Sequence, residues 1–599
     1  MGKLKIYWMT LCIATLVVAC KTEPKIEKDN NNVATDFEAF LMDYYEEGLR
    51  LNPLDATFQG DYRFNDQLPN ILSDEFTDKT KAYYTKYKSR LEEFDDTSLS
   101  ENEKMTKAIL TWDFEVNLEG FNYRSDLMPI DQFNSFNLTI GQLASGKSAV
   151  PFNTVQDYMD WLKRLDQYLE WMSSAEVKMK EGVKAGYVLP KSLIVKALPQ
   201  LKVLINDNLD EHIFYAPIKN FPENFSEREK DQLTTAYSKM ISEKIIPAYK
   251  NMYNYMSTDY LDAGRMSSGI SDIPQGEAYY DYLIKVNTTT DMKADEIHQI
   301  GLSEVKRILS EMEEVKAEVG YKGDLKSFFN YVRSNRELMP FTEAQQVIDN
   351  FYAIHDRMKP QLEKLFDKRP KTAFEVKQVE AFREASASAH YDPGSLDGTR
   401  PGVFYTPILD VTEYNTYLDE STFLHEAIPG HHYQVSLTQE NEELPHFRKT
   451  QSYSGYDEGW ALYTESLGKE LGLYEDPYQY FGMLDAEMHR AIRLVVDTGL
   501  HSKGWTREQA IEYSLDNEAA SETSIISEIE RYMVIPGQAL SYKIGQLKIR
   551  ELRAKAEAAL GDDFDIREFH NQVLETGSIP LALLENKINE WIRSKKAKG

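Results

Sequence analysis

The most informative stretch of this 599-residue chain runs from 422 to 432 and reads Thr422-Phe423-Leu424-His425-Glu426-Ala427-Ile428-Pro429-Gly430-His431-His432. An apolar lead-in ends in a histidine beside a glutamate, and two further histidines follow within two helical turns. Because adjacent residues on a helix point about 100° apart, His425 can face a metal ion while Glu426 faces a water molecule. The stretch therefore predicts a helix that carries a hydrolytic metal site.

The histidines do not have the spacing of a standard helical zinc motif. In that motif the second histidine lies four residues after the first, and here Pro429 occupies that position. His431 and His432 come six and seven residues after His425. On a regular helix His432 would lie within about 20° of His425, and His431 about 120° away. Pro429 and Gly430 argue against a regular helix, because proline clashes with the preceding turn and glycine adopts unusual backbone angles.

A further metal ligand is offered by a later segment, Tyr456-Asp457-Glu458-Gly459-Trp460-Ala461-Leu462-Tyr463-Thr464-Glu465. Glu458 comes 27 residues after His431, a distance typical of zinc peptidases whose third ligand is a glutamate. A catalytic zinc ion needs about three protein ligands and an open position for water, and a nearby carboxylate such as Glu426 to take a proton from that water. Glu465, seven residues after Glu458 and on the same helical face, is suited to accept a hydrogen bond from a ligand imidazole.

Outside these segments, the sequence predicts helices almost throughout. Apolar residues make up 42% of the chain, and glycine (30) and proline (22) are sparse, which favours a mainly α fold. Apolar residues recur at three- and four-residue steps in two clear stripes, which we expect to face the core. The first stripe is Tyr158, Trp161, Leu162, Leu165, Tyr168, Leu169 and Met172, and the second is Ile297, Ile300, Val305, Ile308, Met312 and Val315.

One segment breaks the helical pattern. Residues 390–402 are rich in turn formers and lead into a short apolar run, so we expect a loop and then a strand at Val403–Ile408 beside the active site. The chain divides into an N-terminal helical half, 37–280, and a catalytic helical half, 281–599. The expected architecture is a large multi-helix, zincin-like fold with a substrate cleft between these halves.

The N-terminus has the features of an export signal. A positively charged head precedes an apolar stretch over 6–18 that is too short to span a bilayer. The sequence Leu16-Val17-Val18-Ala19-Cys20 then resembles a bacterial lipobox, which predicts a signal peptide over 1–20, lipidation of Cys20 and a flexible tether over 21–36. The alternative is a plain secretory signal with an accidental cysteine. Cys12, the other cysteine, would be discarded, and the protein would be a lipoprotein of the cell envelope, on the periplasmic or surface side.

The charge of the chain argues against nucleic acid as a partner. Its formal net charge is −29, with 97 acidic and 68 basic residues, and such a surface repels phosphate backbones. We expect a peptide substrate and contact with the membrane only through the N-terminal lipid. The sequence does not indicate an oligomeric state.

Several segments together resemble the bacterial domain of unknown function 885 family. They are HEAIPGHHYQ at 425–434, DEGWALYTE at 457–465, RLVVDTGLHSKGW at 493–505, ERYMVIPGQALSYKIG at 530–545, EIHQIGLSEVKRI at 296–308 and YDPGSLDGTRPGVFYTP at 391–407. The family is grouped with gluzincin-like metallopeptidases and is largely helical. The resemblance implies His425, His431 and Glu458 as zinc ligands and Glu426 as the general base, and it favours His431 over His432. It implies a reaction class, because the substrates of most members are not established.

A looser similarity links the chain to helical zinc peptidases of the angiotensin-converting-enzyme type. There an Arg-Tyr pair on a late helix lies over the metal, and Arg531-Tyr532 occupies the matching place in chain order. The resemblance implies that Tyr532 donates to the oxyanion, a role worth roughly 2.7–4 kcal/mol, and that Arg531 binds substrate; the alternative for Tyr532 is a core position. His501 is a second oxyanion candidate. Weaker candidates are Arg490, Arg493 and Tyr542, of which Tyr542 is also expected to contact substrate.

The sequence thus predicts a zinc metallopeptidase that cleaves peptides in the cell envelope, with Glu426 as its base. A hydrolase of non-peptide amides or esters would show the same ligand set. A catalytically inactive, lipid-anchored binding protein is the other alternative. The complete set of expected catalytic residues argues against it.

Overall fold

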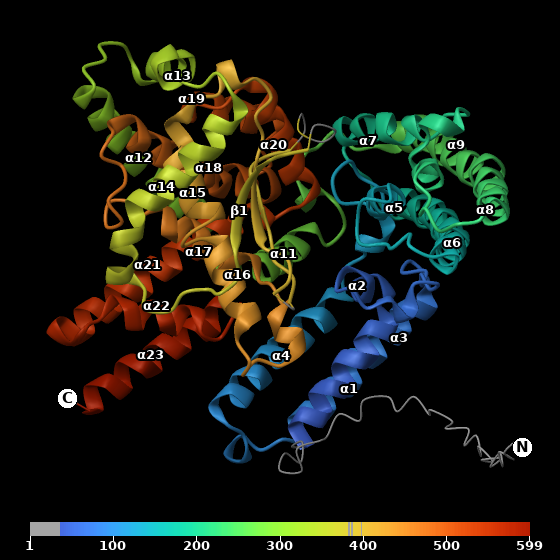
Figure 1. The fold of residues 1–599 in the computed structure, drawn as a ribbon, viewed down its shortest axis with the longest axis horizontal. Helices are drawn as coiled ribbons and strands as arrows, with labels where there is room; N and C mark the ends of the chain where they lie inside the picture. Colours follow the sequence, from blue (N-terminus) through green and yellow to red (C-terminus); the bar gives the residue numbers. More distant parts are fainter. Residues whose placement is uncertain (1–35, 381–383, 385–386, 397, 599) are drawn as a thin grey trace, which may run out of the picture.

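The structure, a computed structural model, describes residues 36–380, 384, 387–396 and 398–598. The predicted signal peptide, its lipidated Cys20 and the tether up to residue 35 lie outside the described residues. Helices dominate the described chain (Figure 1), as the composition predicted. No helix within the described ranges has both the length and the apolar character that crossing a membrane requires.

The helices of the first part of the chain are α1 (Asp36–Leu51), α2 (Pro53–Phe58), α3 (Asp74–Glu92), α4 (Glu101–Gly120), α5 (Phe136–Ala144), α6 (Val155–Ala185), α7 (Lys191–Val203), α8 (Glu227–Met240), α9 (Ile246–Tyr255), α10 (Leu261–Ala263) and α11 (Gly276–Thr288). The second part contains α12 (Ala294–Glu318), α13 (Leu325–Ser334), α14 (Ala344–Leu365), α15 (Asp419–Glu426), α16 (His431–Glu440), α17 (Ser454–Glu465), α18 (Pro477–Ser502), α19 (Arg507–Asn517), α20 (Glu522–Val534), α21 (Ser541–Leu560), α22 (Ile566–Leu574) and α23 (Leu581–Lys598).

The predicted apolar stripes face the core. The first stripe lies on α6, where every member except Leu169 is buried, and the second lies on α12, where every member except Ile300 is buried. Helix α6 begins with a capping box between Thr154 and Asp157, in which each side chain satisfies a backbone amide of the first turn. Periodic burial of large side chains, at about 25 cal/mol per Å² of apolar surface, stabilises helices of this length.

The hydrophobic side chains form separate cores. Helices α5 to α9 lie together on one side of the molecule (Figure 1) around a core that includes Trp161 and Tyr249. Helices α1, α3 and α4 share a small core, and a larger one extends over α11 to α23 and the sheet. The expected division near residue 280 falls within α11, whose Tyr280 and Ile284 belong to the larger core.

A small mixed sheet accompanies the helices. Its strands are β1 (Phe374–Gln378), β2 (His390–Asp392) and β3 (Gly402–Thr406), in the order β1-β3-β2. Strand β3 is parallel to β1 and antiparallel to β2, and it contacts α16. The predicted strand at 403–408 is therefore β3, although it begins one residue earlier and ends two earlier. Strand β2 lies in the segment expected to be a loop, and β1 was not expected.

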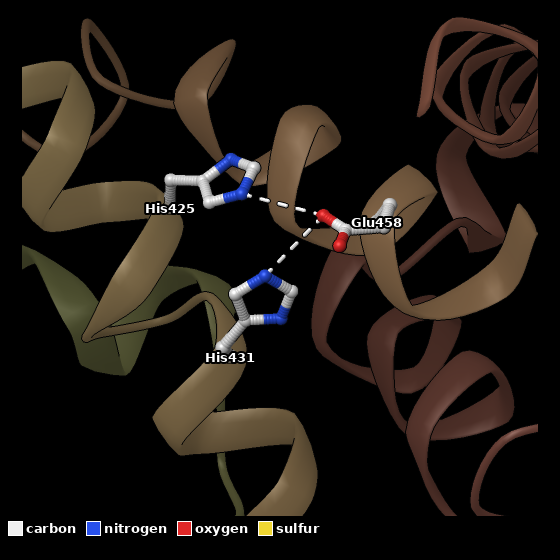
Figure 2. Close-up of side chains that lie close together, drawn as sticks. All are labelled: His425, His431 and Glu458. Atoms are coloured by element: carbon white, nitrogen blue, oxygen red, sulfur yellow. Dashed lines mark ion pairs between the residues drawn. The ribbon is translucent and has the colours of Figure 1, made fainter. Parts of the chain in front are cut away.

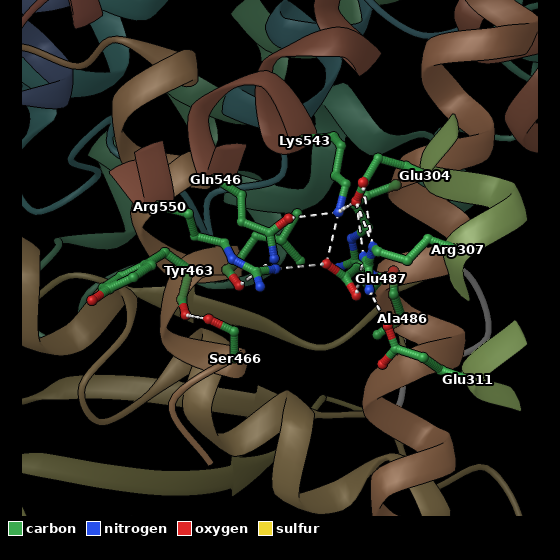
Figure 3. Close-up of polar contacts among 12 residues, drawn as sticks. Glu304, Arg307, Glu311, Tyr463, Ser466, Ala486, Glu487, Lys543, Gln546 and Arg550 are labelled. Carbon is green, nitrogen blue, oxygen red and sulfur yellow. Dashed lines mark hydrogen bonds and ion pairs between the residues drawn. The ribbon is translucent and has the colours of Figure 1, made fainter. Parts of the chain in front are cut away.

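Buried charges join the long helices of the second part (Figure 3). The ammonium of Lys543 on α21, which is fully buried, lies 2.7 Å from a carboxylate oxygen of Glu487 on α18 and 2.8 Å from one of Glu304 on α12. Arg307 on α12 pairs with the same Glu487 at 2.9 Å. Burial alone would raise the pKa of Glu487. The positive charges of Lys543 and Arg307 more than offset this effect and lower the pKa to about 2. Because removing one partner of a buried pair costs about 3–5 kcal/mol, this network fixes α18 relative to α12 and α21.

Candidate metal centre

The helix that carries His425 is interrupted where the Pro-Gly pair occurs. Helix α15 ends at Glu426, and α16 begins at His431. A side chain at Gly430 would place its Cβ only 1.9 Å from the carbonyl oxygen of His425, so only glycine permits this approach of the two helices. His425 and His431 therefore belong to different helices, and the spacing rule of a continuous helix does not apply.

Helix α17 packs against this break. The indole nitrogen of Trp460 donates to the carbonyl oxygen of Pro429 at 2.9 Å. The hydroxyl of Thr464 donates to the carbonyl oxygen of Leu424 at 2.8 Å. Buried carbonyls without partners are costly, and these bonds satisfy two of those that the interrupted helix leaves. The same helix carries Glu458 towards the histidines.

His425, His431 and Glu458 point toward one another (Figure 2). The Nε2 atoms of His425 and His431 lie 3.5 Å and 3.4 Å from Oε2 of Glu458. Their ligand atoms all lie within 4.8 Å of one another. The imidazole rings are nearly perpendicular, with centroids 4.8 Å apart, so both Nε2 atoms can be directed at one point.

These distances fit a zinc ion better than they fit hydrogen bonds. Zinc–ligand bonds of about 2.0–2.1 Å in a tetrahedron place neighbouring ligand atoms roughly 3.3–3.4 Å apart. Oε2 of Glu458 is buried and has no hydrogen-bond partner among the described residues. A buried carboxylate oxygen without a donor is unfavourable unless a cation satisfies it. The group of His425, His431 and Glu458 can therefore hold a metal ion.

The electrostatics of the three residues are strongly coupled. Burial lowers the pKa of His425 and His431, but the neighbouring carboxylates, above all Glu458, together outweigh burial, so the pKa of His425 rises to about 10 and that of His431 also rises. Burial raises the pKa of Glu458, yet the two histidines hold it well below its ordinary range. A divalent cation would take the place of the imidazole protons, so its binding releases protons and is pH-dependent.

Glu465 orients the first histidine. One carboxylate oxygen accepts a hydrogen bond from Nδ1 of His425 at 2.7 Å, and the other accepts from the hydroxyl of Ser421 at 2.7 Å. This fixes the tautomer of His425 so that Nε2 is free for a metal. The contact between Glu465 and a ligand imidazole was predicted from the sequence. Ser421 was missed, although it lies four residues before His425, on the same helical face.

His432 lies away from the group. Its Nδ1 is 3.0 Å from the hydroxyl of Tyr391, and its ring packs against Phe374 and Tyr391 of the sheet. Burial lowers its pKa to about 4, so the ring is neutral. The structure thus places His431 with His425, and the regular-helix geometry that would have favoured His432 does not hold.

Glu426, the last residue of α15, lies beside the two histidines. Burial raises the pKa of its carboxyl, while His425, His431 and Arg490 oppose that effect and Glu458 adds to it. The net result is a raised pKa. A carboxylate whose pKa is shifted towards neutrality is a better proton acceptor for catalysis than an ordinary surface glutamate.

The structure does not support His501 as an oxyanion donor. The side chain is fully buried, Nδ1 accepts a hydrogen bond from the backbone nitrogen of Ile270 at 3.0 Å, and Nε2 lies 3.0 Å from the backbone oxygen of Tyr532. Both ring nitrogens therefore bind the backbone, and burial lowers the pKa of His501 to about 3. His501, on α18, thus links the backbone of Tyr532 on α20 to that of Ile270 and has no free ring nitrogen for an oxyanion.

The predicted Arg531-Tyr532 pair is engaged with other side chains. The hydroxyl of Tyr532 donates to Glu528 at 2.7 Å and accepts from Nε of Arg493 at 2.9 Å. Arg531 donates to Glu528 and to the side-chain oxygen of Gln538. The ring of Tyr532 thus belongs to the larger hydrophobic core, while its hydroxyl lies in a buried polar cluster and its phenol proton has a carboxylate partner.

Tyr542 lies on α21, which packs against α17, the helix that carries Glu458. Helix α17 contacts α21 through glycines: a Cβ at Gly459 would lie 2.5 Å from the backbone of Gly545. This close packing brings Tyr542 near Glu458, whose charge adds to the effect of burial in raising the phenol pKa, while Arg493 lowers it. The spacing of glycines at 455 and 459 is the sequence signal that could have indicated this helix contact.

The structure contains a cavity at the junction of the two halves, but it does not include the metal group. It has a volume of about 620 Å³ and is lined by residues of α1 and α4 and by residues 442–447.

The sequence matches the family described as bacterial protein of unknown function (DUF885) over residues 53–588. A crystal structure of a putative lipoprotein from Colwellia psychrerythraea is similar, with 28% identity and a TM-score of 0.83 over 93% of this chain and 99% of that one. A putative lipoprotein of unknown function from Shewanella oneidensis shares the fold, with 20% identity and a TM-score of 0.74 over 92% of this chain and 99% of that one. No curated protein matches. The chain belongs to the DUF885 family.

Proposed function

We propose that this DUF885 protein is a zinc-dependent hydrolase, of the gluzincin-like type, that cleaves peptides in the cell envelope. The observation that carries the proposal is the convergence of His425, His431 and Glu458, with a buried Glu458 oxygen that lies 3.4–3.5 Å from both imidazoles and has no hydrogen-bond donor among the residues described. Three ligands from two histidines and one glutamate, with a carboxylate beside them, form the ligand set of catalytic rather than structural zinc sites. The zincin-like character of the fold and a substrate cleft between its halves belong to the same proposal.

The chemistry divides between the bound ion and the side chains around it. Zinc supplies, when bound, a Lewis acid that acidifies water and polarises a carbonyl group. Glu426 accepts the proton of the attacking water and returns it to the leaving amine. The raised pKa of Glu426 suits both steps, because a base with too low a pKa holds the proton too weakly. Glu465 keeps His425 in the ligating tautomer throughout.

Tyr542 is the phenol that we assign to the oxyanion. It lies near Glu458, and Arg493 stacks on its ring at 4.6 Å from the centroid. The cation lowers the phenol pKa and makes Tyr542 a stronger donor towards a substrate carbonyl oxygen that gains negative charge. Tyr532, whose proton is directed at Glu528, then holds Arg493 in place.

The place of action follows from the N-terminal sequence. The pattern that ends in Cys20 is that of a lipidated cysteine, and two structurally similar proteins are described as putative lipoproteins. We therefore assign the protein to the cell envelope, anchored through Cys20, with envelope peptides as its substrates.

The test combines metal content with turnover. Full-length protein, extracted in detergent and purified without chelators, should contain about one zinc ion per chain by elemental analysis and should cleave members of a tetrapeptide library. Glu426→Gln should retain the zinc and lose turnover, because the amide keeps the shape but cannot accept a proton. An absence of transition metal would overturn the proposal. If the protein cleaved acyl amides or esters but no peptide, its substrates would be non-peptide amides or esters. If it bound zinc but showed no turnover, it would be a catalytically inactive binding protein.

A further inference from the structure

Cationic side chains gather beside the metal group on α18 and α20. Arg490 and Arg493 come from α18, and Arg531 comes from α20. The chain as a whole has a net charge of −29, so a cluster of partly buried guanidinium groups is not an average property of its surface. Buried guanidinium groups are unfavourable unless counter-ions or hydrogen-bond acceptors satisfy them.

Two of these guanidinium groups are incompletely satisfied. The side chain of Arg493 is only 9% exposed. Its Nε donates to Tyr532 and its Nη2 to Glu528, but its Nη1 is buried without a partner among the described residues. Arg490 donates from Nη1 to the backbone oxygen of Ala486 at 3.3 Å, and its Nε is likewise buried without a described partner.

The carboxylates paired with this cluster leave donors unused. Glu528 is shared by Arg493 and Arg531, each of which it contacts at 3.0 Å. Glu518 pairs with His489 at 2.5 Å. Within the described part of the chain no carboxylate pairs with Arg490. The cluster therefore has unused N–H donors, which an anionic ligand would satisfy.

The unused donors lie next to the reacting groups. Arg490 is near enough to Glu426 to lower the pKa of its carboxyl, against the effect of burial. Arg493 stacks on Tyr542, which in turn lies near Glu458. Helix α18, which carries both arginines, also contacts α15, the helix of His425 and Glu426. An anion held by the arginines would therefore lie close to a bond cleaved at the metal group.

From this geometry we propose that Arg490 and Arg493 bind the free C-terminal carboxylate of a peptide, so that the protein releases short C-terminal fragments. This inference rests on the proposed hydrolase function and specifies its substrate class. Planar guanidinium groups recognise carboxylates through paired, charge-assisted hydrogen bonds. A substrate carboxylate near the scissile bond could also belong to an acidic side chain, and the experiment separates these two sources.

The experiment compares matched peptides. A set of N-acetylated tetrapeptides is made with a free C-terminal acid, with a C-terminal amide, and with an amide plus a penultimate glutamate. The wild-type protein should cleave the free acids with a kcat/KM at least tenfold higher than either amide. Arg490→Gln should lower kcat/KM for the acids at least tenfold more than for the amides. Arg490→Lys should restore part of the preference, because it keeps the charge but not the paired donors.

A binding measurement makes the test independent of turnover. In the Glu426→Gln background, calorimetry should give at least tenfold tighter binding of the free-acid peptide than of its amide, and Arg490→Gln should abolish the difference. Arg493→Lys is the second variant, since it retains a cation beside Glu528 and Tyr532. The matched control is Arg228→Gln, which replaces an exposed arginine on α8. It should change neither the acid-to-amide ratio of kcat/KM nor the acid-to-amide ratio of binding affinity.

The outcomes separate this inference from the proposed function. Equal cleavage and binding of acids and amides would overturn the carboxylate site and leave the hydrolase intact. A loss in Arg490→Gln that is the same for acids and amides would also overturn it, because the guanidinium would then act on the transition state or on folding. Preference for the glutamate-containing amide would assign the arginines to an acidic side chain instead. No cleavage of any peptide would refute the peptidase, while acid-selective binding would still support the carboxylate site.

Discussion

The role of Glu465 can be tested through the affinity of the protein for zinc. The side chain is 2% exposed and touches no expected substrate position; its carboxylate binds Nδ1 of His425 and the hydroxyl of Ser421, each at 2.7 Å. Replacing it with glutamine preserves size and one acceptor oxygen and removes the negative charge. Replacing it with alanine removes the acceptor as well.

The magnitude follows from what each variant loses. A hydrogen bond to a charged group contributes about 1.5–3 kcal/mol and a neutral one about 0.5–1.5 kcal/mol, so Glu465→Gln should cost about 1–1.5 kcal/mol of zinc binding. That is roughly a tenfold increase in Kd, the lower end of the 10–100-fold range for partners of metal-bound histidines. Glu465→Ala leaves the buried Nδ1 of His425 without an acceptor. The increase in Kd for zinc should therefore approach about 100-fold.

The assay is competition for zinc with a chromophoric chelator. Kd is measured for the wild type, Glu465→Gln, Glu465→Ala and the control Glu470→Gln, a half-exposed carboxylate that pairs with Arg553 at 2.9 Å. The melting temperature of each zinc-free protein shows whether the variant is folded. If both Glu465 variants are folded and bind zinc as tightly as the wild type, then His425 is not a zinc ligand oriented by Glu465. The proposed role of Glu465 in the metal centre would then be wrong.

Three further predictions address the ligands, the oxyanion and acid stability. His431→Ala should lose its zinc in elemental analysis, whereas His432→Ala should keep most of it; the reverse result would contradict the described placement of the rings. Tyr542→Phe should lower kcat about 10²–10³-fold with little change in KM, as expected for a lost oxyanion donor, and Tyr532→Phe should have a smaller effect; equal effects would reject the assignment. Burial lowers the pKa of His501 to about 3, below the ordinary value of about 6.5, so the unfolded chain binds this proton first. The neutral imidazole contributes fully to the free energy of unfolding above about pH 6.5, and this contribution is lost as the pH falls towards 3. At pH 5 the loss amounts to about 2 kcal/mol. Urea unfolding at pH 7 and pH 5 should therefore show a weaker pH dependence for His501→Gln than for the wild type, and an unchanged dependence would count against the buried, neutral imidazole.

Local sequence patterns were sufficient to predict the helices and strand β3 but not strands β1 and β2. The stripe that begins at Tyr158 repeats often enough to identify one face of α6, because each helical turn adds independent evidence. Strand β1 has five residues and β2 has three, and their stability depends on pairing with β3. A strand pair of this length leaves almost no pattern in the sequence, since its partners lie many residues away.

The three residues of the candidate metal group could be predicted from the sequence, but their surroundings could be predicted only in part. The motifs identified His425, His431 and Glu458, because ligand chemistry restricts residue type and spacing. By contrast, the hydrogen-bond partners of His501 and Arg493 come from other elements. A sequence shows that such residues are present but not which of their donors are already used.

The interrupted helix explains how a sequence without the standard spacing forms a metal group. In a continuous helix the rigid backbone places both histidines on one face, whereas here His425 lies in the last turn of α15, His431 begins α16, and the close approach at Gly430 sets their separation. An interruption in a buried helix normally leaves carbonyl groups without donors. Helix α17 supplies those donors from Trp460 and Thr464, and it also carries Glu458. The helix that stabilises the break therefore also positions Glu458, so the Pro-Gly interruption and the glutamate form one structural unit rather than two separate features of the sequence.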